Sequence, residues 1–461
     1  MKKNMVVKAL AAVASLSMLT GMAACGSGGS STQGNNAASS SGDCKVFKKY
    51  GNLKGKTVTM FSGWMDEEGD ATNKSFDKFR NCTGANVKYE GSSELSVQLP
   101  VRVKSGSAPD IAVVPQPGML KTMVKTGKTK VMPDSVKANI DKYYSKDWQE
   151  YSSVDGKIYG IALDASTKSF IWYSPKKFKE KGYKVPQTWD EMMTLTKKIA
   201  ADTKGTDAKP WSVGIEGGAS TGWPATDWLE DAVIRFTDVD TYNKWVSHEI
   251  PFNDPKILAS FEQIGKILKN NDYVNGGLGD SQSIASTAWQ DAGTPLLNGK
   301  GYMMHMAPFY QTNFKSANPD IKIAPDGDAW VFLMPGKTKD SKPVLGGGDF
   351  AISFANRPEV NALLTYLSSP DWANERARQM GGWVYPNKGL DVSLLGSQLD
   401  KLSYKTLVDP KTEFRFDGSD LMPSEVGAGS FWKKMTEYFA QNKSEKETLD
   451  QIEASWQRDV N

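Results

Sequence analysis

The sequence predicts an α/β protein of two domains, and three observations support this fold class. From residue 56 onwards, short apolar runs alternate with helical stretches, which is typical of a parallel sheet with helices on both faces. About 400 residues follow the N-terminal segment, too many for one small core. No segment in this part is apolar enough to cross a membrane.

The individual elements are recognised by the spacing of their apolar residues. Buried strands are expected at 56–61, 86–90, 110–114, 159–163 and 169–173. Helices are expected at 69–82, at 95–103 with an interruption at Pro100, at 188–201 and after Ser444. Thr188 and Ser444 each begin a capping box, and Pro358 and Pro370 stand where the first turn of a helix favours proline.

Residues 1–24 have the layout of an export signal. Lysines precede an apolar run at 9–20, and small residues then lead to Cys25. A cysteine at this position resembles the lipobox of bacterial lipoproteins, which implies that Cys25 is lipidated and becomes the N-terminus. The alternative is an ordinary secretory signal with an incidental cysteine. Residues 25–43 consist mostly of Gly, Ser, Ala and Asn, a composition that favours a flexible tether.

The chain after the signal carries no net charge and few cysteines. Without the three signal lysines it has 53 basic and 53 acidic residues, so no nucleic-acid-binding or polybasic surface is expected. Cys44 and Cys82 remain after Cys25, and an even number in an oxidising location favours a disulfide, with two free buried thiols as the alternative. The sequence has no CxxC and no Cys/His cluster, so a zinc site is not expected.

No motif for catalysis or for a cofactor stands out in the sequence. His248 and His305 lack metalloprotease spacing, and the Gly-Lys-Thr segments lack the earlier glycine of a phosphate loop. The acidic cluster at 66–70 is interpreted as a solvated helix start rather than as paired catalytic carboxylates. The two carboxylates of a glycosidase have no fixed spacing, so that enzyme class stays open. No metal and no cofactor are expected.

The aromatic residues give the best indication of a ligand. Several of the 14 tryptophans lie in segments with Gly or Pro, among them Trp64, Trp223 and Trp383. An aromatic side chain in a loop is often presented to a partner, and a sugar ring packs well on an indole face. Structural packing is the alternative for each, and it is favoured for Trp172, Trp189, Trp245, Trp432 and Trp456.

Five sequence segments follow one another in a characteristic order. They are SAPDIA at 107–112, GIAL at 160–163, IWYS at 171–174 with Phe178, PQTWDEM at 186–192 and GGDFAI at 347–352. Behind a lipobox, they resemble the extracellular solute-binding proteins of sugar ABC transporters, the type that includes maltose-binding protein. Segments 114–118 and 222–228 are most similar to the branch that takes α-glucosides, and Cys44 and Cys82 match a cysteine pair of that branch.

This resemblance implies a type II periplasmic-binding-protein-like fold, in which two α/β lobes close on a ligand by hinge motion. The implied parts are a signal at 1–24, a tether at 25–43, lobe 1 at 44–163 plus 309–354, and lobe 2 at 164–308 plus 355–461. The chain is expected to cross between the lobes after Leu163, near 303–308 and near 353–356.

The implied function is capture of a solute without catalysis. The protein is expected to be the extracytoplasmic, lipid-anchored binding component of an ABC importer for oligosaccharides such as α-glucosides. Its expected partners are the sugar, the permease subunits and the membrane lipid attached through Cys25, but no nucleic acid. The alternatives are a protein of the same fold for a peptide or polyamine, and a surface glycosidase.

Ligand contacts are expected in the loops at the carboxyl ends of strands, the usual ligand position in open α/β sheets. Trp383 is expected to hold an open indole platform, because Gly381 and Gly382 free the backbone and Pro386 stiffens the exit. The expected ligand-binding residues are Trp64, Asp66, Glu94, Gln116, Asp164, Trp223, Asp227, Trp228, Asp349, Trp383 and Tyr385.

Overall fold

The structure, a computed structural model, describes residues 44–277, 279–409 and 411–459. Cys44–Asn461 forms one compact unit. The expected signal, Cys25 and the tether lie outside the described residues. In the described part, no helix is both long enough and apolar enough to cross a membrane.

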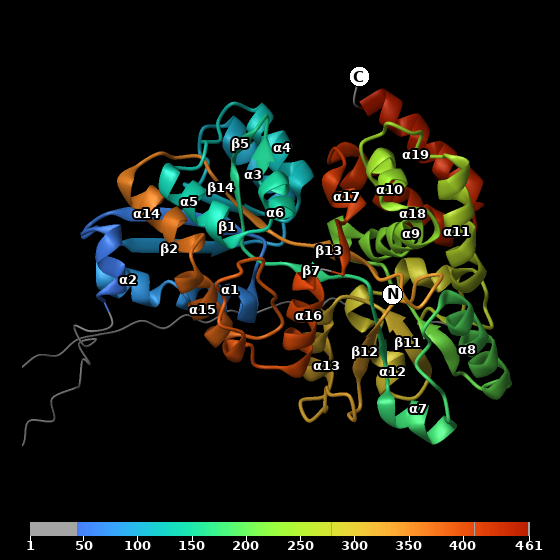
Figure 1. The fold of residues 1–461 in the computed structure, drawn as a ribbon. Coiled ribbons are helices and arrows are strands. Elements are labelled where there is room, and N and C mark those ends of the chain that lie inside the picture. The colour runs from blue at the N-terminus through green and yellow to red at the C-terminus, as the bar shows by residue number, and fades with distance from the viewer. Residues whose placement is uncertain (1–43, 278, 410, 460–461) are drawn as a thin grey trace, which may run out of the picture. The chain divides into compact units, whose positions relative to one another are not determined.

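The first sheet contains the strands expected near the start of the chain. Its order is β2 (Asn86–Gly91), β1 (Thr57–Ser62), β3 (Ile111–Val114), β14 (Phe350–Ser353) and β6 (Gly160–Ala162). β1 pairs in parallel with β2 and β3, whereas β14 runs antiparallel between β3 and β6. A late strand therefore lies within an early sheet (Figure 1).

All but the first of the helices around this sheet contribute apolar residues to one core. They are α1 (Asp66–Lys74), α2 (Asp77–Thr83), α3 (Leu95–Lys104), α4 (Pro117–Lys125), α5 (Asp134–Tyr143), α6 (Lys146–Tyr151), α14 (Pro358–Leu367) and α15 (Pro370–Gln379). Two helices differ from expectation. The helix expected at 69–82 is divided into α1 and α2, and α3 continues through Pro100, whose ring lies on the exposed side of the helix.

A second sheet has its own core. Its order is β10 (Val274–Asn275), β9 (Lys209–Ser212), β11 (Gly301–His305), β8 (Phe170–Tyr173) and β12 (Trp330–Leu333). β8 is antiparallel to both of its neighbours. Its helices are α7 (Pro175–Lys181), α8 (Trp189–Asp202), α9 (Trp223–Phe236), α10 (Val239–Val246), α11 (Pro255–Leu268), α12 (Thr294–Leu297), α13 (Gln311–Ala317), α18 (Trp432–Ala440) and α19 (Glu445–Asp459). Thr188 caps α8 as expected, because Glu191 N–H donates to the Thr188 hydroxyl over 3.2 Å. The Glu191 carboxylate accepts from Gln187 N–H, one residue before the position that a regular capping box uses.

A small third sheet links the two large ones. Its order is β15 (Glu413–Phe416), β13 (Pro343–Gly347) and β7 (Ser166–Thr167). β7 follows β6 and precedes β8, and β13 follows β12 and precedes β14, so both strands belong to segments that pass from one large sheet to the other. In Figure 1, β7 and β13 accordingly lie between the two groups of elements.

Shorter elements complete the described part. They are the hairpin strands β4 (Ser153–Val154) and β5 (Lys157–Ile158), and helices α16 (Gln398–Val408) and α17 (Gly418–Leu421). The 3₁₀-helices are η1 (Val46–Tyr50), η2 (Gly218–Ser220), η3 (Gln282–Ser286), η4 (Trp289–Asp291), η5 (Pro308–Tyr310) and η6 (Val392–Leu394), and η7 (Glu425–Phe431) is a π-helix.

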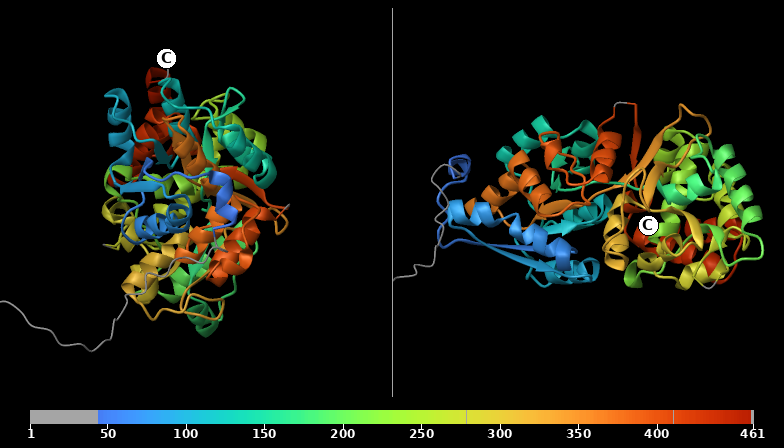
Figure 2. Two further views of the ribbon diagram at one scale, coloured as in Figure 1. Left: turned by 90° about the vertical axis from the view of Figure 1, so that its left-hand side faces the viewer. Right: turned by 90° about the horizontal axis from the view of Figure 1, so that it is seen from below.

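Several elements pack with a different core from the one expected. α13 and β12 were expected in lobe 1, yet Phe314 of α13 packs against Trp172 of the second sheet, and β12 pairs with β8 there. Helices α14 and α15 were expected in lobe 2, yet Val360 and Trp372 are buried in the first core, and both helices accompany β1 and β2 in Figure 1 and Figure 2. Long-range pairing decides such placements, and local periodicity does not encode it. The division into two lobes stays a proposal, with these segments exchanged.

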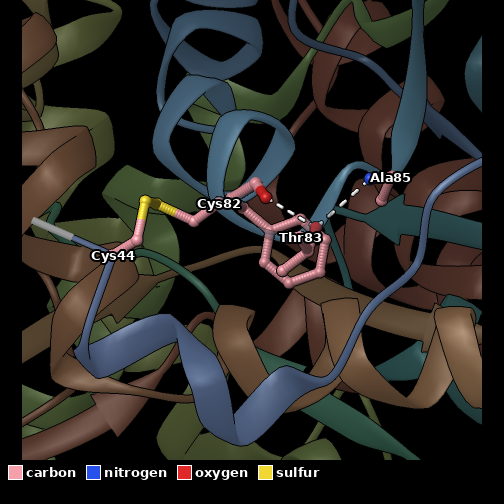
Figure 3. Close-up of a disulfide and its surroundings, with 5 residues drawn as sticks. Cys44, Cys82, Thr83 and Ala85 are labelled. Carbon is pink, nitrogen blue, oxygen red and sulfur yellow. Dashed lines mark hydrogen bonds between the residues drawn. A yellow bond between two sulfur atoms is a disulfide. The ribbon is translucent and has the colours of Figure 1, made fainter. Parts of the chain in front are cut away.

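A disulfide joins Cys44 to Cys82, the pair that the sequence favours. It connects the first described residue to the end of α2 (Figure 3), with 5.2 Å between the two Cα atoms. Beside it, the Thr83 hydroxyl donates to the Phe79 carbonyl over 2.6 Å and accepts from Ala85 N–H over 3.3 Å. In the chain-entropy model, a loop of this length stabilises the fold by about 3–4 kcal/mol.

Candidate functional site

A cavity of about 810 Å³ lies beside the third sheet. Its wall is built from chain segments that directly follow strands: Trp64 after β1, Pro115 after β3, Asp164 after β6 and Asp349 after β13. Residues from α9, η4, η5 and α13 also line it, as do residues from α1, α3, α17 and the loop at 380–383. The position agrees with the rule that ligands bind at the carboxyl ends of strands.

Trp64 is fixed at this wall by hydrogen bonds on both its ring and its backbone. Its indole N–H donates to Asp349 Oδ2 over 3.0 Å, and its backbone N–H donates to the Ser62 hydroxyl over 2.9 Å. The Tyr89 hydroxyl donates to the Trp64 carbonyl over 2.7 Å. A Cβ at Gly91 would stand 2.3 Å from that same carbonyl oxygen, so only glycine fits there. The ring is therefore held in place before any ligand arrives.

Asp349, which accepts from the Trp64 indole, also contacts Asp164. The Asp349 backbone N–H donates to Asp164 Oδ1 over 2.7 Å. Burial, together with the nearby charge of Glu68, raises the pKa of the Asp349 carboxyl to about 7. Burial and the charge of Asp349 likewise hold the pKa of Asp164 well above its ordinary value. Of the two, the Asp349 carboxyl is therefore poised to accept or release a proton near neutral pH.

Trp383 packs against Trp64 with 4.5 Å between the ring centroids. Its indole N–H donates to Glu68 Oε1 over 2.5 Å, and the Arg376 guanidinium lies 3.8 Å from its ring centroid. Burial raises the pKa of Glu68, against the opposing effect of the Trp383 hydrogen bond. Trp383 lines the cavity but is only 5% exposed. The expected open platform is thus largely enclosed, because Arg376 and Trp64 cover much of the ring.

Lys168, on the segment that follows β7, joins the wall to a buried carboxylate cluster. Its ammonium forms ion pairs with Asp227, over 3.1 Å, and with Asp417, and it lies 4.0 Å from Asp420. Burial alone lowers the pKa of Lys168, but the three carboxylate charges outweigh it and hold that pKa well above its ordinary value. The Gln116 side-chain amide donates to Asp420 Oδ1 over 2.8 Å, which ties the start of α4 to this cluster.

The same cluster has the ligand types of a cation site. Asp227, Glu230 and Asp417 each offer an oxygen, and these atoms lie within 4.8 Å of one another. However, Glu230 accepts from the backbone N–H groups of Gly418 and Ser419, and Lys168 already supplies a positive charge. The carboxylates are thus engaged with the protein itself.

A second set of aromatic rings borders the cavity. Trp223 begins α9, Trp289 begins η4 and Phe309 lies in η5. The ring centroids are 5.5 Å apart for Trp223 and Trp289, and 5.9 Å apart for Trp289 and Phe309. Each of the three is partly exposed, in contrast to Trp64 and Trp383.

Six of the expected ligand-binding residues line the cavity: Trp64, Asp66, Asp164, Trp223, Asp349 and Trp383. Gln116 and Asp227 lie just behind it, in contact with Asp420 and Lys168. For all eight, a ligand contact remains a prediction.

The structure places the other three expected residues outside the wall. Trp228 is buried against Trp211 and His305, because it lies five residues after Trp223 and therefore on another face of α9. Tyr385 is buried behind Trp383. Glu94 is exposed at the start of α3.

Other wall residues were not foreseen from the sequence. The acidic cluster at 66–70 does begin a helix, as expected, but Glu68 is directed at Trp383 and not into solvent. Glu68 follows closely after β1 and Trp64, and this position at the carboxyl end of a strand could have identified it as a wall residue. Nothing local marks Lys168, Trp289 or Asp420 in the wall, or Arg376 behind Trp383, because the partners that define them lie far away in the sequence.

Comparison with known families gives a match over residues 62–374, to the model described as bacterial extracellular solute-binding protein. The alpha-glucosides-binding periplasmic protein AglE of Rhizobium meliloti is 34% identical over 422 residues, covering 89% of each chain. The osmoprotective compounds-binding protein GgtB of Synechocystis sp. is 33% identical, over 87% of this chain and 93% of its own.

Solved structures share the fold. One is the bacterial solute receptor AcbH, described as preferring b-D-galactopyranose, with a TM-score of 0.74 and 18% identity over 88% of this chain and all of its own. Maltose-bound MalE3 of T. maritima has a TM-score of 0.66 and 16% identity, over 87% of this chain and 99% of its own. These likenesses confirm the type II periplasmic-binding-protein-like fold that the sequence predicts.

Proposed function

This chain belongs to the bacterial extracellular solute-binding proteins, and from that premise we propose that it captures an α-glucoside and delivers it to an ABC permease. The relative AglE, 34% identical, is named for binding alpha-glucosides. Members of the family act outside the cytoplasm, where such a protein meets its solute. The role requires binding and release, and no catalysis by the protein itself.

The observation that carries the proposal is the pairing of indoles with carboxylates at the cavity wall. Trp64 donates to Asp349, and Trp383 donates to Glu68. Each carboxylate has about four lone-pair sites and uses only part of them, so it can still accept hydrogen bonds from ligand hydroxyls. The adjoining ring surfaces are apolar. An apolar wall with a few fixed acceptors suits the C–H faces and hydroxyl edges of a sugar.

Movement of the two lobes would couple capture to delivery. We place the hinge in the segments around β7 and β13, which pass between the large sheets. In this proposal, lobe 1 contains the first sheet with α14 and α15, and lobe 2 contains the second sheet. A sugar that contacts both lobes favours the closed form of the protein, and the permease recognises that form.

Attachment to the membrane is a separate proposal. Cys25 follows small residues at the end of an export signal, and the following segment to residue 43 is rich in Gly and Ser. A lipid on Cys25 would hold the binding domain near its permease. Cys25→Ala is expected to abolish incorporation of labelled palmitate, and a variant that still carries the label would overturn the anchor.

Calorimetry with a panel of sugars tests the binding function. An α-linked glucosaccharide such as maltose, isomaltose or panose is expected to bind and to raise the melting temperature. α-Galactosides, β-linked oligosaccharides, a peptide and a polyamine serve as comparison ligands. The bound sugar should be recovered intact, since product formation would indicate a glycosidase. Binding of only the peptide or the polyamine would refute the sugar assignment.

An osmoprotective compound is the second candidate. GgtB, named for binding such compounds, is 33% identical to this chain. Several carboxylates but only Lys168 as a charged basic group line the described cavity, and aromatic rings with acidic groups are suited to quaternary ammonium ligands. Glycine betaine therefore belongs in the same panel. Preference for glycine betaine over every sugar would support this candidate against the α-glucoside.

A further inference from the structure

Asp164 and Asp349 lie on the two chain segments that pass between the large sheets. Asp164 stands between β6 and β7, and Asp349 between β13 and β14. The segments run side by side, because Leu163 N–H donates to the Asp349 carbonyl over 2.9 Å and Asp349 N–H donates to Asp164 Oδ1 over 2.7 Å. A Cβ at Gly348 would stand 2.4 Å from the Asp164 carbonyl oxygen, so only glycine allows this approach. The fold therefore brings two carboxyl groups together at the proposed hinge.

No cation of the described part of the chain is in direct contact with this carboxyl pair. The Lys168 ammonium forms its ion pairs within the other carboxylate cluster, and the Arg376 guanidinium lies against the Trp383 ring. These two cations act on the pair only over a distance, and they do not replace an ion pair. The titratable and charged groups that interact with the pair are Glu68 of α1, Tyr89 of β2, Lys168 after β7, Arg376 of α15, Tyr385 beyond the loop at 380–383, and Asp420 of α17.

The Asp349 carboxyl exchanges a proton near neutral pH. Burial and the charge of Glu68 raise the pKa of Asp349 to about 7, whereas burial and the charge of Asp349 hold the pKa of Asp164 well above its ordinary value. Loss of the first proton therefore leaves a single negative charge on the pair. The Trp64 indole N–H, which donates to Asp349 Oδ2 over 3.0 Å, stabilises that charge.

Asp349 also lines the cavity, so its protonation determines how it can bind a ligand. A charged carboxylate only accepts hydrogen bonds and has about four lone-pair sites, whereas a protonated carboxyl uses one oxygen as a donor. The Trp64 indole occupies one of these sites. A sugar hydroxyl that donates to the charged carboxylate forms a stronger hydrogen bond than it would with the neutral acid. The sugar is therefore expected to prefer the deprotonated form of Asp349.

From this geometry we infer that a proton and the sugar compete for the Asp349 carboxyl, so that capture releases a proton and acidification favours release of the sugar. The inference rests on the proposed function and concerns the regulation of the same site. The proton passes from a carboxyl oxygen of Asp349 to water, and a sugar hydroxyl donates to the freed carboxylate. No covalent bond of the sugar changes.

Titration calorimetry between pH 5.5 and 8 tests the inference, with maltose or with the sugar of the panel that binds most tightly. The affinity is expected to be about thirty-fold weaker at pH 5.5 than at pH 8, because a group with a pKa of about 7 loses its proton over this range. Buffers of different ionisation enthalpy report the proton itself. Phosphate and imidazole at pH 6.5 should show release of about three quarters of a proton per sugar, and phosphate and Tris at pH 8 about a tenth.

Asp349→Asn removes the titrating group. Its affinity is expected to change by less than about three-fold between pH 5.5 and 8, without proton release, since an amide does not titrate in this range. Glu94→Gln is the control, because Glu94 is an exposed carboxylate outside the cavity wall, and it should keep the wild-type profile. If Asp349→Asn does not fold, Trp64→Phe keeps a ring but removes the hydrogen bond that lowers the pKa of Asp349. The midpoint of its pH profile should then lie at higher pH.

Three results overturn the inference while leaving sugar binding intact. The first is a wild-type affinity that does not depend on pH and is accompanied by no proton release. The second is an Asp349→Asn variant with the wild-type pH profile, and the third is an unchanged midpoint in Trp64→Phe. If the wild-type protein binds no sugar at any pH, the proposed function fails, and this inference fails with it.

Discussion

Two groups of carboxylates lie in or directly behind the cavity wall, and the protein stabilises them differently. Asp227, Asp417 and Asp420 surround Lys168 and form the Lys168 cluster. The unpaired carboxylates, Glu68, Asp164 and Asp349, form no ion pair with any described residue.

Hydrogen bonds from indole or backbone N–H groups stabilise the unpaired carboxylates instead. Such bonds leave acceptor capacity for a ligand and place no cation in direct contact with the carboxylate. The difference indicates that the Lys168 cluster maintains the fold, whereas the unpaired carboxylates await a ligand. Removing a charged group from the Lys168 cluster should therefore lower the stability of the fold. Removing a charge from the unpaired carboxylates should instead lower the affinity for the ligand.

The largest effect is expected for Lys168→Met. Removing the ammonium leaves three buried carboxylates without a cation, which costs about 3–5 kcal/mol of unfolding free energy. Denaturant titration measures this loss. Lys176→Met is the control, because Lys176 forms an exposed ion pair with Asp328 and should contribute about 1 kcal/mol or less. Similar losses in the two variants would contradict a structural role for the Lys168 cluster.

Trp383→Ala is expected to lower both affinity and stability. Sugar binding should weaken by about thirty-fold or more, as for an aromatic anchor. Because Trp383 is buried against Arg376, the unfolding free energy should also fall by about 3–5 kcal/mol. Trp383→Phe separates the two effects, since it keeps a ring but removes the donor to Glu68. Unchanged affinity in the phenylalanine variant would exclude that hydrogen bond from ligand binding.

Asp349→Asn sharpens the comparison between the two groups. The amide oxygen can still accept from the Trp64 indole, but the charged acceptor is lost. Sugar affinity is expected to fall by about ten- to a hundred-fold, since a hydrogen bond to a charged group contributes about 1.5–3 kcal/mol. The melting temperature should stay constant or rise, whereas Asp417→Asn in the Lys168 cluster should lower it. A lower melting temperature in both variants would contradict the difference between the two groups of carboxylates.

The smallest effect is a difference in pH dependence. Burial raises the pKa of Asp349 to about 7, so the folded state keeps a proton that the unfolded state loses near pH 4. Its contribution to stability is therefore present below about pH 4 and falls as the pH rises to about 7.

Asp417 should show the opposite dependence. Burial alone would raise the pKa of Asp417, but the Lys168 charge lowers it to about 2. Its contribution is therefore present above about pH 4 and is lost as the pH falls towards 2. Melting temperatures of the wild-type protein and Asp349→Asn between pH 3 and 8 measure the difference. The variant should show a shallower decline from pH 4 to 7, and identical curves would contradict the raised pKa of Asp349.

The sequence predicted an element well where the residues of that one segment are enough to specify it. The strands at β1, β2 and β3 and the capped helix α8 were predicted within one or two residues. Trp223 was nominated for ligand binding because Gly222 and Pro224 flank it; it lies in the cavity wall, and its ligand contact remains a prediction. Trp228, in the same segment, was nominated on the same composition, but helical geometry turns it into the core.

By itself, the sequence determined the alternation of strands and helices, the balanced charge, the favoured disulfide and the resemblance to a solute-binding family. These features depend on local backbone preferences or on composition, so they can be recognised without knowing which distant residues come into contact. Only the tertiary structure decided which core receives α13, α14, α15 and β12, and which side chains meet at the cavity. Trp383 reaches Glu68 across 315 residues of chain, and Trp64 reaches Asp349 across 285. Such contacts depend on how the sheets pack, and no local pattern specifies that packing.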